Sequence, residues 1–219
     1  MGHAHQHAGW TFELLGGRLC LDFANTVSGK RLREPVERLR TWSDLVSWGR
    51  QTGALGEDLA RRLDAEGQRR PGEAAAALRR ALDLREALFR IFRSAAEGRE
   101  PAAEDLEILG SVLSRARSRE RLLRVGERYR LVFPEGEATL DAVLWPVVRS
   151  AAELLTSDEL ARVRICEATP VDGCGWLFLD ETRSGTRRWC SMKDCGNRAK
   201  ARRHYRRTKA VSRREPARR

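Results

Sequence analysis

Four of the five cysteines in this 219-residue chain lie in its last quarter, at positions whose spacing suits a metal site. They are Cys166, Cys174, Cys190 and Cys195, in the pattern C-x7-C-x15-C-x4-C. A structural zinc site needs four donors at tetrahedral corners, about 2.0–2.3 Å from the metal, and thiolates are preferred donors. The spacing therefore predicts one structural Zn²⁺ held by these four side chains. A redox disulfide switch and unliganded core thiols are the two alternatives.

The segment around these cysteines also needs a cross-link in order to fold. About 45 residues bury too little apolar surface to fold alone, so a metal would supply the missing stability. His204 lies nine residues beyond Cys195, roughly 13 Å along a helix, and is not expected to bind the same ion. Cys20 stands among Leu19, Leu21 and Phe23, which predicts a small buried thiol.

Positive charge is concentrated in the same end of the chain. The net charge is +11, yet residues 183–219 hold 15 Lys and Arg against two acidic residues and alone carry +13. The rest of the chain therefore carries about −2. A nearly neutral body with a strongly basic end is typical of a protein that docks a polyanion, and a uniformly basic structural protein would look different.

Most of this charge falls on a helix expected from about residue 192 to 208, opened by a capping box at Ser191 and Asp194. Such a helix can lie in a major groove, with guanidinium groups on phosphates and base edges. Duplex DNA is favoured over RNA because the aromatic clusters of single-strand binders are missing. A solvated basic face is the alternative, and Asn197 can equally cap the zinc knuckle. The candidate contacts are Arg187, Arg188, Lys193, Asn197, Arg198, Lys200, Arg202, Arg203, Arg206 and Arg207.

The elements that must position these residues form two parts. Residues 1–158 predict a mainly α domain with minor β-hairpins, because apolar residues recur at helical spacing. One hairpin, or a strand leading into a helix, is expected around Gly16-Gly17, and another at Tyr129–Phe133 that turns through Pro134–Glu137. The expected helices span 36–53, 57–66, 73–97, 102–117 and 140–155.

The second part begins at Ser157-Asp158-Glu159, where the pattern changes. Short strands at 162–165 and 176–180 and a turn at 182–185 precede the basic helix. Residues 159–208 therefore predict a small zinc-stabilised ββα module, similar to a treble clef or zinc ribbon, with Trp176 and Trp189 under the metal. The basic tail 209–219 lacks apolar anchors and is expected to be disordered.

Weaker patterns leave alternatives open. Asp22 and Asn25 interrupt an apolar run, and they either cap a helix or line a ligand pocket. His3, His5 and His7 alternate and can share one side of an extended chain, either as metal ligands or as idle residues. No secretory signal or transmembrane stretch is present, which predicts a cytoplasmic protein with no membrane partner. No catalytic motif is present either, which predicts that the chain is not an enzyme.

Two motifs resemble a known family. The run Arg188-Trp-Cys-Ser-Met-Lys-Asp-Cys-Gly-Asn-Arg198, with Cys174–Asp180 before it, resembles the CGNR-type zinc finger of bacterial proteins. The run Gly16–Thr26 resembles the opening motif of its partner ABATE domain, a predicted stress-induced transcription regulator. The resemblance implies a four-cysteine zinc site and DNA binding.

The resulting hypothesis is a zinc-dependent DNA-binding transcription regulator whose helical domain senses a signal or mediates assembly. One rival is an RNA-binding adaptor that uses the same finger. The other is an enzyme or ligand-binding protein with its site near Asp22 and Asn25 in the helical domain. The sequence leaves a small-molecule effector and a homo-oligomer open.

Overall fold

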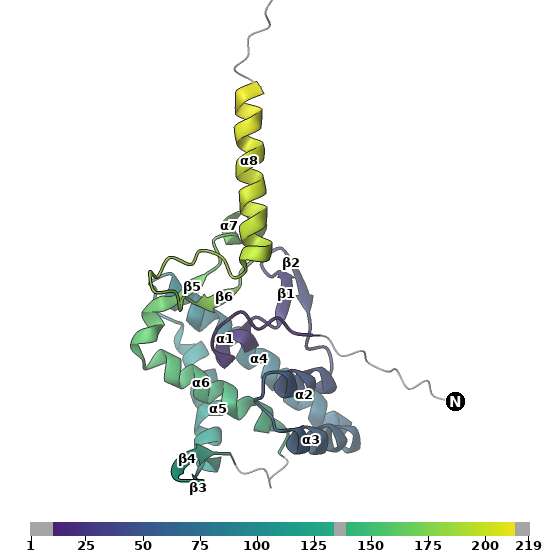
Figure 1. Ribbon diagram of the computed structural model, residues 1–219. Helices are drawn as coiled ribbons and strands as arrows, with labels where there is room; N and C mark the ends of the chain where they lie inside the picture. The colour runs from purple at the N-terminus through teal and green to yellow at the C-terminus, as the bar shows by residue number, and fades with distance from the viewer. Residues whose placement is uncertain (1–10, 134–138, 213–219) are drawn as a thin grey trace, which may run out of the picture.

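The computed structural model describes residues 11–133 and 139–212. A helical body carries three small hairpins, and one long helix, α8, stands out from it (Figure 1). The expected roles of His3, His5 and His7, the turn at Pro134–Glu137 and the tail beyond Ser212 fall outside the described residues. No helix in the described ranges is both long enough and apolar enough to cross a bilayer.

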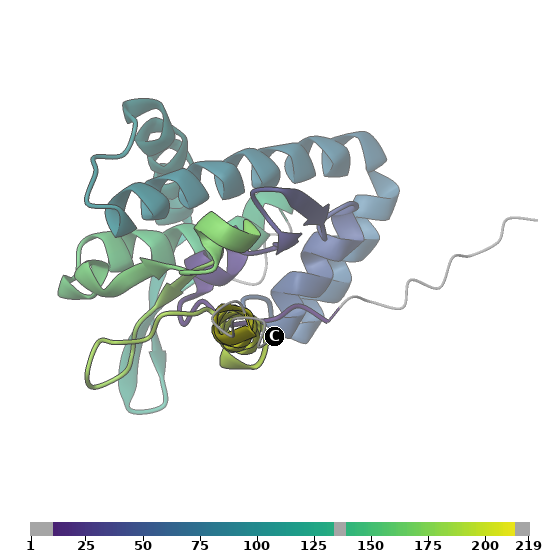
Figure 2. The same ribbon diagram turned by 90° about the horizontal axis from the view of Figure 1, so that it is seen from above.

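The body is built on α4, which runs the length of it in the view along α8 (Figure 2). Its buried stripe includes Leu84, Leu88, Ile91 and Phe92, and α1, α2, α3 and α5 all pack against it. The helices are α1 Leu19–Ala24, α2 Trp42–Gln51, α3 Glu57–Arg69, α4 Pro71–Ala96, α5 Ala103–Arg119, α6 Trp145–Leu155, α7 Thr169–Asp172 and α8 Asn197–Ser212, with short helical turns η1 Leu140–Leu144, η2 Asp158–Arg162 and η3 Met192–Gly196.

The first hairpin corrects the predicted helix over 36–53. Strands β1 (Val27–Lys30) and β2 (Glu34–Glu37) pair antiparallel, and α2 begins only at Trp42. Thr41 sets this start, because its side chain accepts the N–H of Asp44 while the Asp44 carboxylate accepts the N–H of Thr41 in a capping box. Val36 and Leu39 therefore have the spacing of a helix, but Val36 lies in β2 and Leu39 lies before α2 begins.

The second hairpin includes most of the strand expected at Tyr129–Phe133, while the turn expected at Pro134–Glu137 lies outside the described residues. Strand β4 (Arg128–Val132) was predicted in part. It pairs antiparallel with β3 (Arg121–Val125), which precedes it in the chain. Gly126 allows the two-residue connection, since its φ of 65° lies in the left-handed region that tight hairpins need.

The third hairpin joins the body to the cysteine-bearing module. Strands β5 (Val163–Ile165) and β6 (Leu177–Leu179) pair antiparallel. Leu177 and Leu179 lie in the core of the helical body, while Trp176 and Phe178 lie with the cysteines. Successive side chains of a strand point to opposite faces, so this one strand serves two cores. The mainly α body with minor hairpins and the ββα module are both confirmed.

Asn25 locks β6 onto α1. Its amide nitrogen donates to the carbonyl oxygen of Leu177 at 2.8 Å, and its amide oxygen accepts the Leu177 N–H at 3.0 Å. Asn25 is 3% exposed, so both bonds lie in the interior. The Asn25 amide thus makes the two hydrogen bonds with Leu177 that a residue of a neighbouring strand would make.

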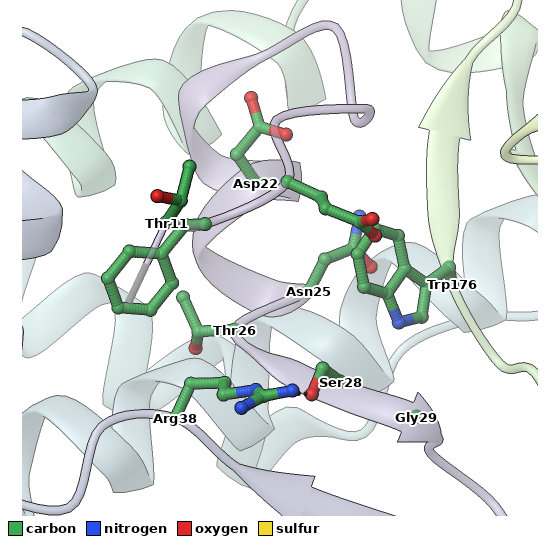
Figure 3. Close-up of a pocket in the computed structure, with 10 residues that line it drawn as sticks. Thr11, Asp22, Asn25, Thr26, Ser28, Gly29, Arg38 and Trp176 are labelled. Atoms are coloured by element: carbon green, nitrogen blue, oxygen red, sulfur yellow. Dashed lines mark hydrogen bonds between the residues drawn. The ribbon is translucent and has the colours of Figure 1, made fainter. Parts of the chain in front are cut away.

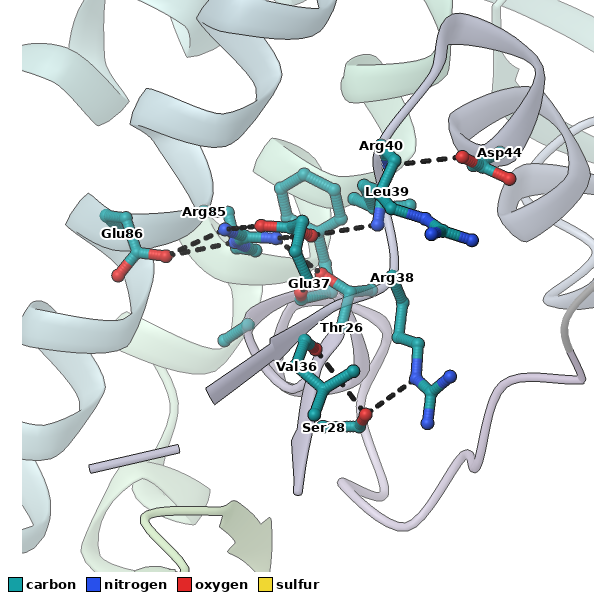
Figure 4. A network of polar contacts seen from close by, with 12 residues as sticks. Thr26, Ser28, Val36, Glu37, Arg38, Leu39, Arg40, Asp44, Arg85 and Glu86 are labelled. Carbon is teal, nitrogen blue, oxygen red and sulfur yellow. Dashed lines mark hydrogen bonds and ion pairs between the residues drawn. The ribbon is translucent and has the colours of Figure 1, made fainter. Parts of the chain in front are cut away.

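A buried ionic network fastens the first hairpin to α4 (Figure 4). The guanidinium of Arg85 holds both carboxylate oxygens of Glu37 at 2.7 Å. Arg31 binds Glu86 at 2.8 Å and lies 3.8 Å above the ring of Phe89. Burial raises the pKa of Glu37, but the pair with Arg85 outweighs it and holds that pKa below its usual value. The hairpin is therefore a rigid part of the body.

Removing the Asn25 amide should weaken the whole protein. Asn25→Ala leaves a buried N–H and a buried C=O of Leu177 without partners, which costs about 2 kcal/mol or more in the free energy of unfolding. Urea denaturation measures the loss. Gln68→Ala, which removes an amide exposed on α3, should change the same quantity by less than about 0.5 kcal/mol. Equal losses of unfolding free energy in the two variants would contradict the role assigned to the Asn25 hydrogen bonds.

Candidate metal centre and nucleic-acid interface

The four predicted cysteines meet at one buried point. One Sγ atom from each of Cys166, Cys174, Cys190 and Cys195 lies within 4.8 Å of the others. Three of the sulfur–sulfur distances are 3.6, 3.7 and 3.7 Å. A tetrahedron with zinc–sulfur bonds of about 2.3 Å has edges of about 3.8 Å, and a disulfide would need about 2.05 Å. The spacing therefore fits a zinc ion and leaves all five cysteines of the chain unbridged.

The electrostatics of the cluster also call for a cation. The pKa of Cys166 is well below that of a free thiol, because Cys174 and the other two thiols donate hydrogen bonds to it. The pKa of Cys190 is raised beside Cys166 and Cys174. Four thiolates in so small a volume repel one another, and a divalent ion is what allows all of them to lose their protons.

The first two ligands are positioned by the helical body. Cys166 follows β5, and its N–H donates to the carbonyl of Trp176. Cys174 stands between Gly173 and Gly175, whose φ angles of 71° and 74° need glycine. The loop of the first hairpin holds this turn, because the N–H of Arg31 donates to the Cys174 carbonyl at 3.1 Å. Sequence reasoning missed this support, since nothing in the residues 31–33 marks a contact with position 174.

The other two ligands bracket a helical turn. Cys190 precedes η3 and Cys195 lies within it. The Ser191 hydroxyl oxygen accepts the N–H of Asp194 at 3.2 Å and donates to its carboxylate at 2.7 Å. The Ser191 half of the predicted capping box is therefore present, whereas the Asp194 carboxylate accepts the Ser191 hydroxyl and not a backbone N–H. Helix α8 follows to Ser212, beyond the predicted end at Thr208.

The four residues Cys195–Arg198 each have a separate task. Cys195 is a ligand, and Gly196 packs so closely that a Cβ there would lie 2.6 Å from the sulfur of Met192. The Asn197 amide donates to the carbonyl of Lys193 at 2.9 Å and closes the turn. Arg198 reaches back and donates to Sγ of Cys195 at 3.1 Å. A guanidinium in that position offsets the negative charge of a thiolate-rich site.

Two predicted nucleic-acid contacts, Arg198 and Arg202, also form ion pairs within the module, with side chains 54% and 33% exposed. Arg202 pairs with Asp172 at 2.5 Å, and Arg198 lies 3.5 Å from the same carboxylate. The pKa of Asp172 is lowered, chiefly by the hydrogen bond from Arg202. Asp172, which sequence reasoning did not single out, thus orients α8 relative to the zinc loop.

Arg187 is an internal residue. Its guanidinium lies 4.3 Å from the ring centre of Phe178 and donates to the carbonyls of Leu15 and Cys190. Trp176 and Phe178 are buried with the cysteines, and Trp189 packs against them, as the sequence predicted for both tryptophans.

Five arginines, Arg202 among them, line an open groove of about 420 Å³ between α8 and α7. Arg203, Arg206 and Arg207 line one wall, and Arg188 stacks 4.9 Å above Trp189 on the other. Arg188 also pairs with Glu167 at 2.5 Å. Lys193, Asn197 and Lys200 are exposed beside the groove. Whether these side chains contact nucleic acid stays a prediction.

Asp22 and Asn25 line a separate cleft of about 240 Å³ between α1, β1 and Trp176 (Figure 3). Asn25 is occupied by Leu177, as described above. Asp22 accepts the N–H of Gly16 at 2.8 Å, and burial raises its pKa to about 6. The indole nitrogen of Trp176 is buried and finds no acceptor among the described residues.

Cys20 is buried elsewhere in the core, where burial raises its pKa to about 12.

A helical body joined to a four-thiol centre beneath a basic helix defines a zinc-finger protein. Residues 17–158 match the family described as "Putative stress-induced transcription regulator" (ABATE), and residues 162–208 match the CGNR zinc finger. The chain belongs to the ABATE family and carries a CGNR finger with one structural zinc site. Neither description is that of an enzyme. A comparison with curated proteins gives no match.

Zinc content should depend on the cluster alone. The wild-type chain is expected to hold about one zinc per chain, and Cys195→Ser to hold close to none, because three thiolates and a hydroxyl bind the ion far more weakly. Inductively coupled plasma mass spectrometry of the purified proteins gives the ratio. Cys20→Ala removes a buried thiol outside the cluster and should keep its zinc. Retention of zinc by Cys195→Ser would contradict the assignment.

Asp22 should make stability fall with rising pH. Its folded pKa of about 6 lies above the unfolded value of 3.8, so the folded protein holds the proton more tightly. Stability from this group is complete below about pH 4 and is lost by pH 6, a change of up to about 3 kcal/mol. The difference in urea midpoint between wild type and Asp22→Asn should therefore grow over that range. Asp83→Asn, an exposed carboxylate on α4, should show no such growth.

Proposed function

We propose that the chain is a zinc-dependent transcription regulator that binds duplex DNA with the outward face of α8. The observation that carries this proposal is the division of basic residues on that helix. Arg198 and Arg202 are held by Cys195 and Asp172 on one side of the helix. Lys200, Arg203 and Arg207 lie at spacings that place them on one exposed face, with Arg206 beside them.

The dimensions and setting of α8 support duplex binding. Its 16 residues would span about 24 Å, and it projects clear of the body (Figure 1). The major groove of B-DNA admits an α-helix. The protein groove beside α8 would then place Arg188 and Trp189 near one phosphate strand. No acidic residue lies on α8, so nothing on the helix itself offsets its attraction for phosphates.

Salt dependence tests the proposal. Fluorescence anisotropy with a mixed-sequence duplex should show affinity falling steeply as salt rises, because counterions leave the DNA. The combined variant Arg203→Ala, Arg206→Ala and Arg207→Ala should bind far more weakly, and the slope of log affinity against log salt should shrink by about 3. Zinc content should stay unchanged, since none of the three touches the cluster.

The matched control removes three exposed arginines from the body, with Arg61→Ala, Arg79→Ala and Arg115→Ala. Both triple variants lose the same net charge, so an equal loss of affinity would show that total charge and not α8 binds the DNA. Tighter binding to an RNA of equal length would favour the RNA-binding adaptor instead.

The helical domain supplies the signal or the assembly surface in this proposal. The cleft at Asp22 supports a sensing role, because its wall includes Trp176, two residues after the ligand Cys174. An occupant would touch the body and the finger together. Native mass spectrometry that finds a small molecule on the wild-type chain and not on Asp22→Asn would support this role, or the rival in which the cleft is a ligand-binding or catalytic site.

A further inference from the structure

The β3–β4 ribbon exposes more apolar surface than its size explains. Five of the twelve exposed large apolar side chains in the described part of the chain lie on this hairpin, and each is between 43% and 69% exposed. They are Leu122, Leu123, Val125, Tyr129 and Leu131. Because side chains alternate along a strand, Leu123 and Val125 lie on one face of the ribbon, and Leu122, Tyr129 and Leu131 lie on the other. So many exposed apolar side chains on one small element indicate an interaction surface, whereas single exposed leucines do not.

One edge of the ribbon is open. On the β4 side, Arg149 of α6 donates to the carbonyl oxygen of Leu131 at 2.9 Å and so occupies that edge. On the other side, β3 pairs with β4 alone within residues 11–133 and 139–212. A strand edge with unpaired N–H and C=O groups is a template for another strand. A two-stranded ribbon is also marginal in water by itself, and further strands stabilise it.

We propose that β3 pairs antiparallel with β3 of a second copy of this chain, which joins the two ribbons into a four-stranded sheet. A twofold axis at Leu123 aligns the whole strand with its copy. Leu123 then faces Leu123, Leu122 faces Arg124, and Arg121 faces Val125. No arginine lies directly opposite another, and the two copies of Arg124 are diagonal neighbours.

The composition of the ribbon favours a protein partner over nucleic acid. Residues 121–132 contain arginine, tyrosine and aliphatic residues but no lysine. Arginine and tyrosine are enriched at protein interfaces while lysine is depleted there. Contacts with phosphates would leave Leu122, Leu123 and Val125 without apolar neighbours, whereas a second ribbon paired at the β3 edge gives each of them a cross-strand neighbour.

The position of the ribbon makes the pairing compatible with the zinc finger. Figure 1 places β3 and β4 at the end of the body opposite α8, so the pairing leaves α8 of each copy uncovered. The proposed dimer extends the assembly role of the helical domain and does not require that α8 binds DNA. Its test therefore uses the zinc-loaded chain with no nucleic acid.

Sedimentation equilibrium of the full-length, nuclease-treated protein should give a mass of twice 24.8 kDa. Leu123→Lys puts two ammonium groups against each other at the twofold axis and should give a monomer, with unchanged zinc content and helicity. Leu106→Lys changes an exposed leucine on α5 of similar exposure, 43% against 49%, and should leave the dimer intact.

Other outcomes would overturn the proposal. A wild-type monomer at the highest concentration that stays in solution excludes the pairing, and a dimer of Leu123→Lys shows that another surface forms it. Hydrogen exchange separates the pairing from a general loss of structure, because the amides of 121–125 should be protected in the wild type and lose protection in Leu123→Lys while those of α4 keep theirs. If the wild type is a monomer and the double variant Arg128→Ala, Arg130→Ala binds DNA more weakly, the ribbon is a nucleic-acid contact instead.

Discussion

Strand β6 is the constraint on which the rest of the molecule depends. Its alternating side chains place Leu177 and Leu179 among the helices and Trp176 and Phe178 among the cysteines. Because one strand has two buried faces, the body and the finger share a wall. The module of about 45 residues that seemed too small to fold therefore borrows apolar surface from the helical body, and zinc is not its only source of stability.

This shared wall sets what the metal does. Cys166 follows a strand that the body already holds, and Cys174 lies in a turn bound by the first hairpin through Arg31. Cys190 is supported through one side chain, because Arg187 donates both to its carbonyl and to the carbonyl of Leu15, and Cys195 lies in a turn held by short-range bonds. Zinc binding then acts mainly on the C-terminal half of the module, because it ties η3 and α8 to two ligands that are already positioned.

The sequence predicts the features that follow from local residue patterns and misses those that depend on contacts between distant residues. The zinc ligands could be found because four thiols at a suitable spacing match the donor set of a structural zinc site. Long periodic helices such as α4 could be found from their apolar stripe. The strands β1 and β2 could not, because Val36 and Leu39 also fit a helical period. Composition located the basic charge but could not show which arginines form contacts within the module, since that depends on Asp172 and Phe178, which lie outside α8.

The arginines held by Cys195 and Asp172 link the metal to the proposed DNA-binding face. Arg198 contacts Sγ of Cys195, and Arg202, one turn later, pairs with Asp172 beside the zinc loop. Together they fix the rotation of α8 about its own axis, and this rotation decides which side of the helix faces outward. Residues at i+3 and i+4 lie on one side of a helix, so fixing Arg198 and Arg202 also fixes the direction of Arg203 and Arg207, which line the groove beside α7. The zinc site therefore determines both that α8 is held and the direction in which its arginines point.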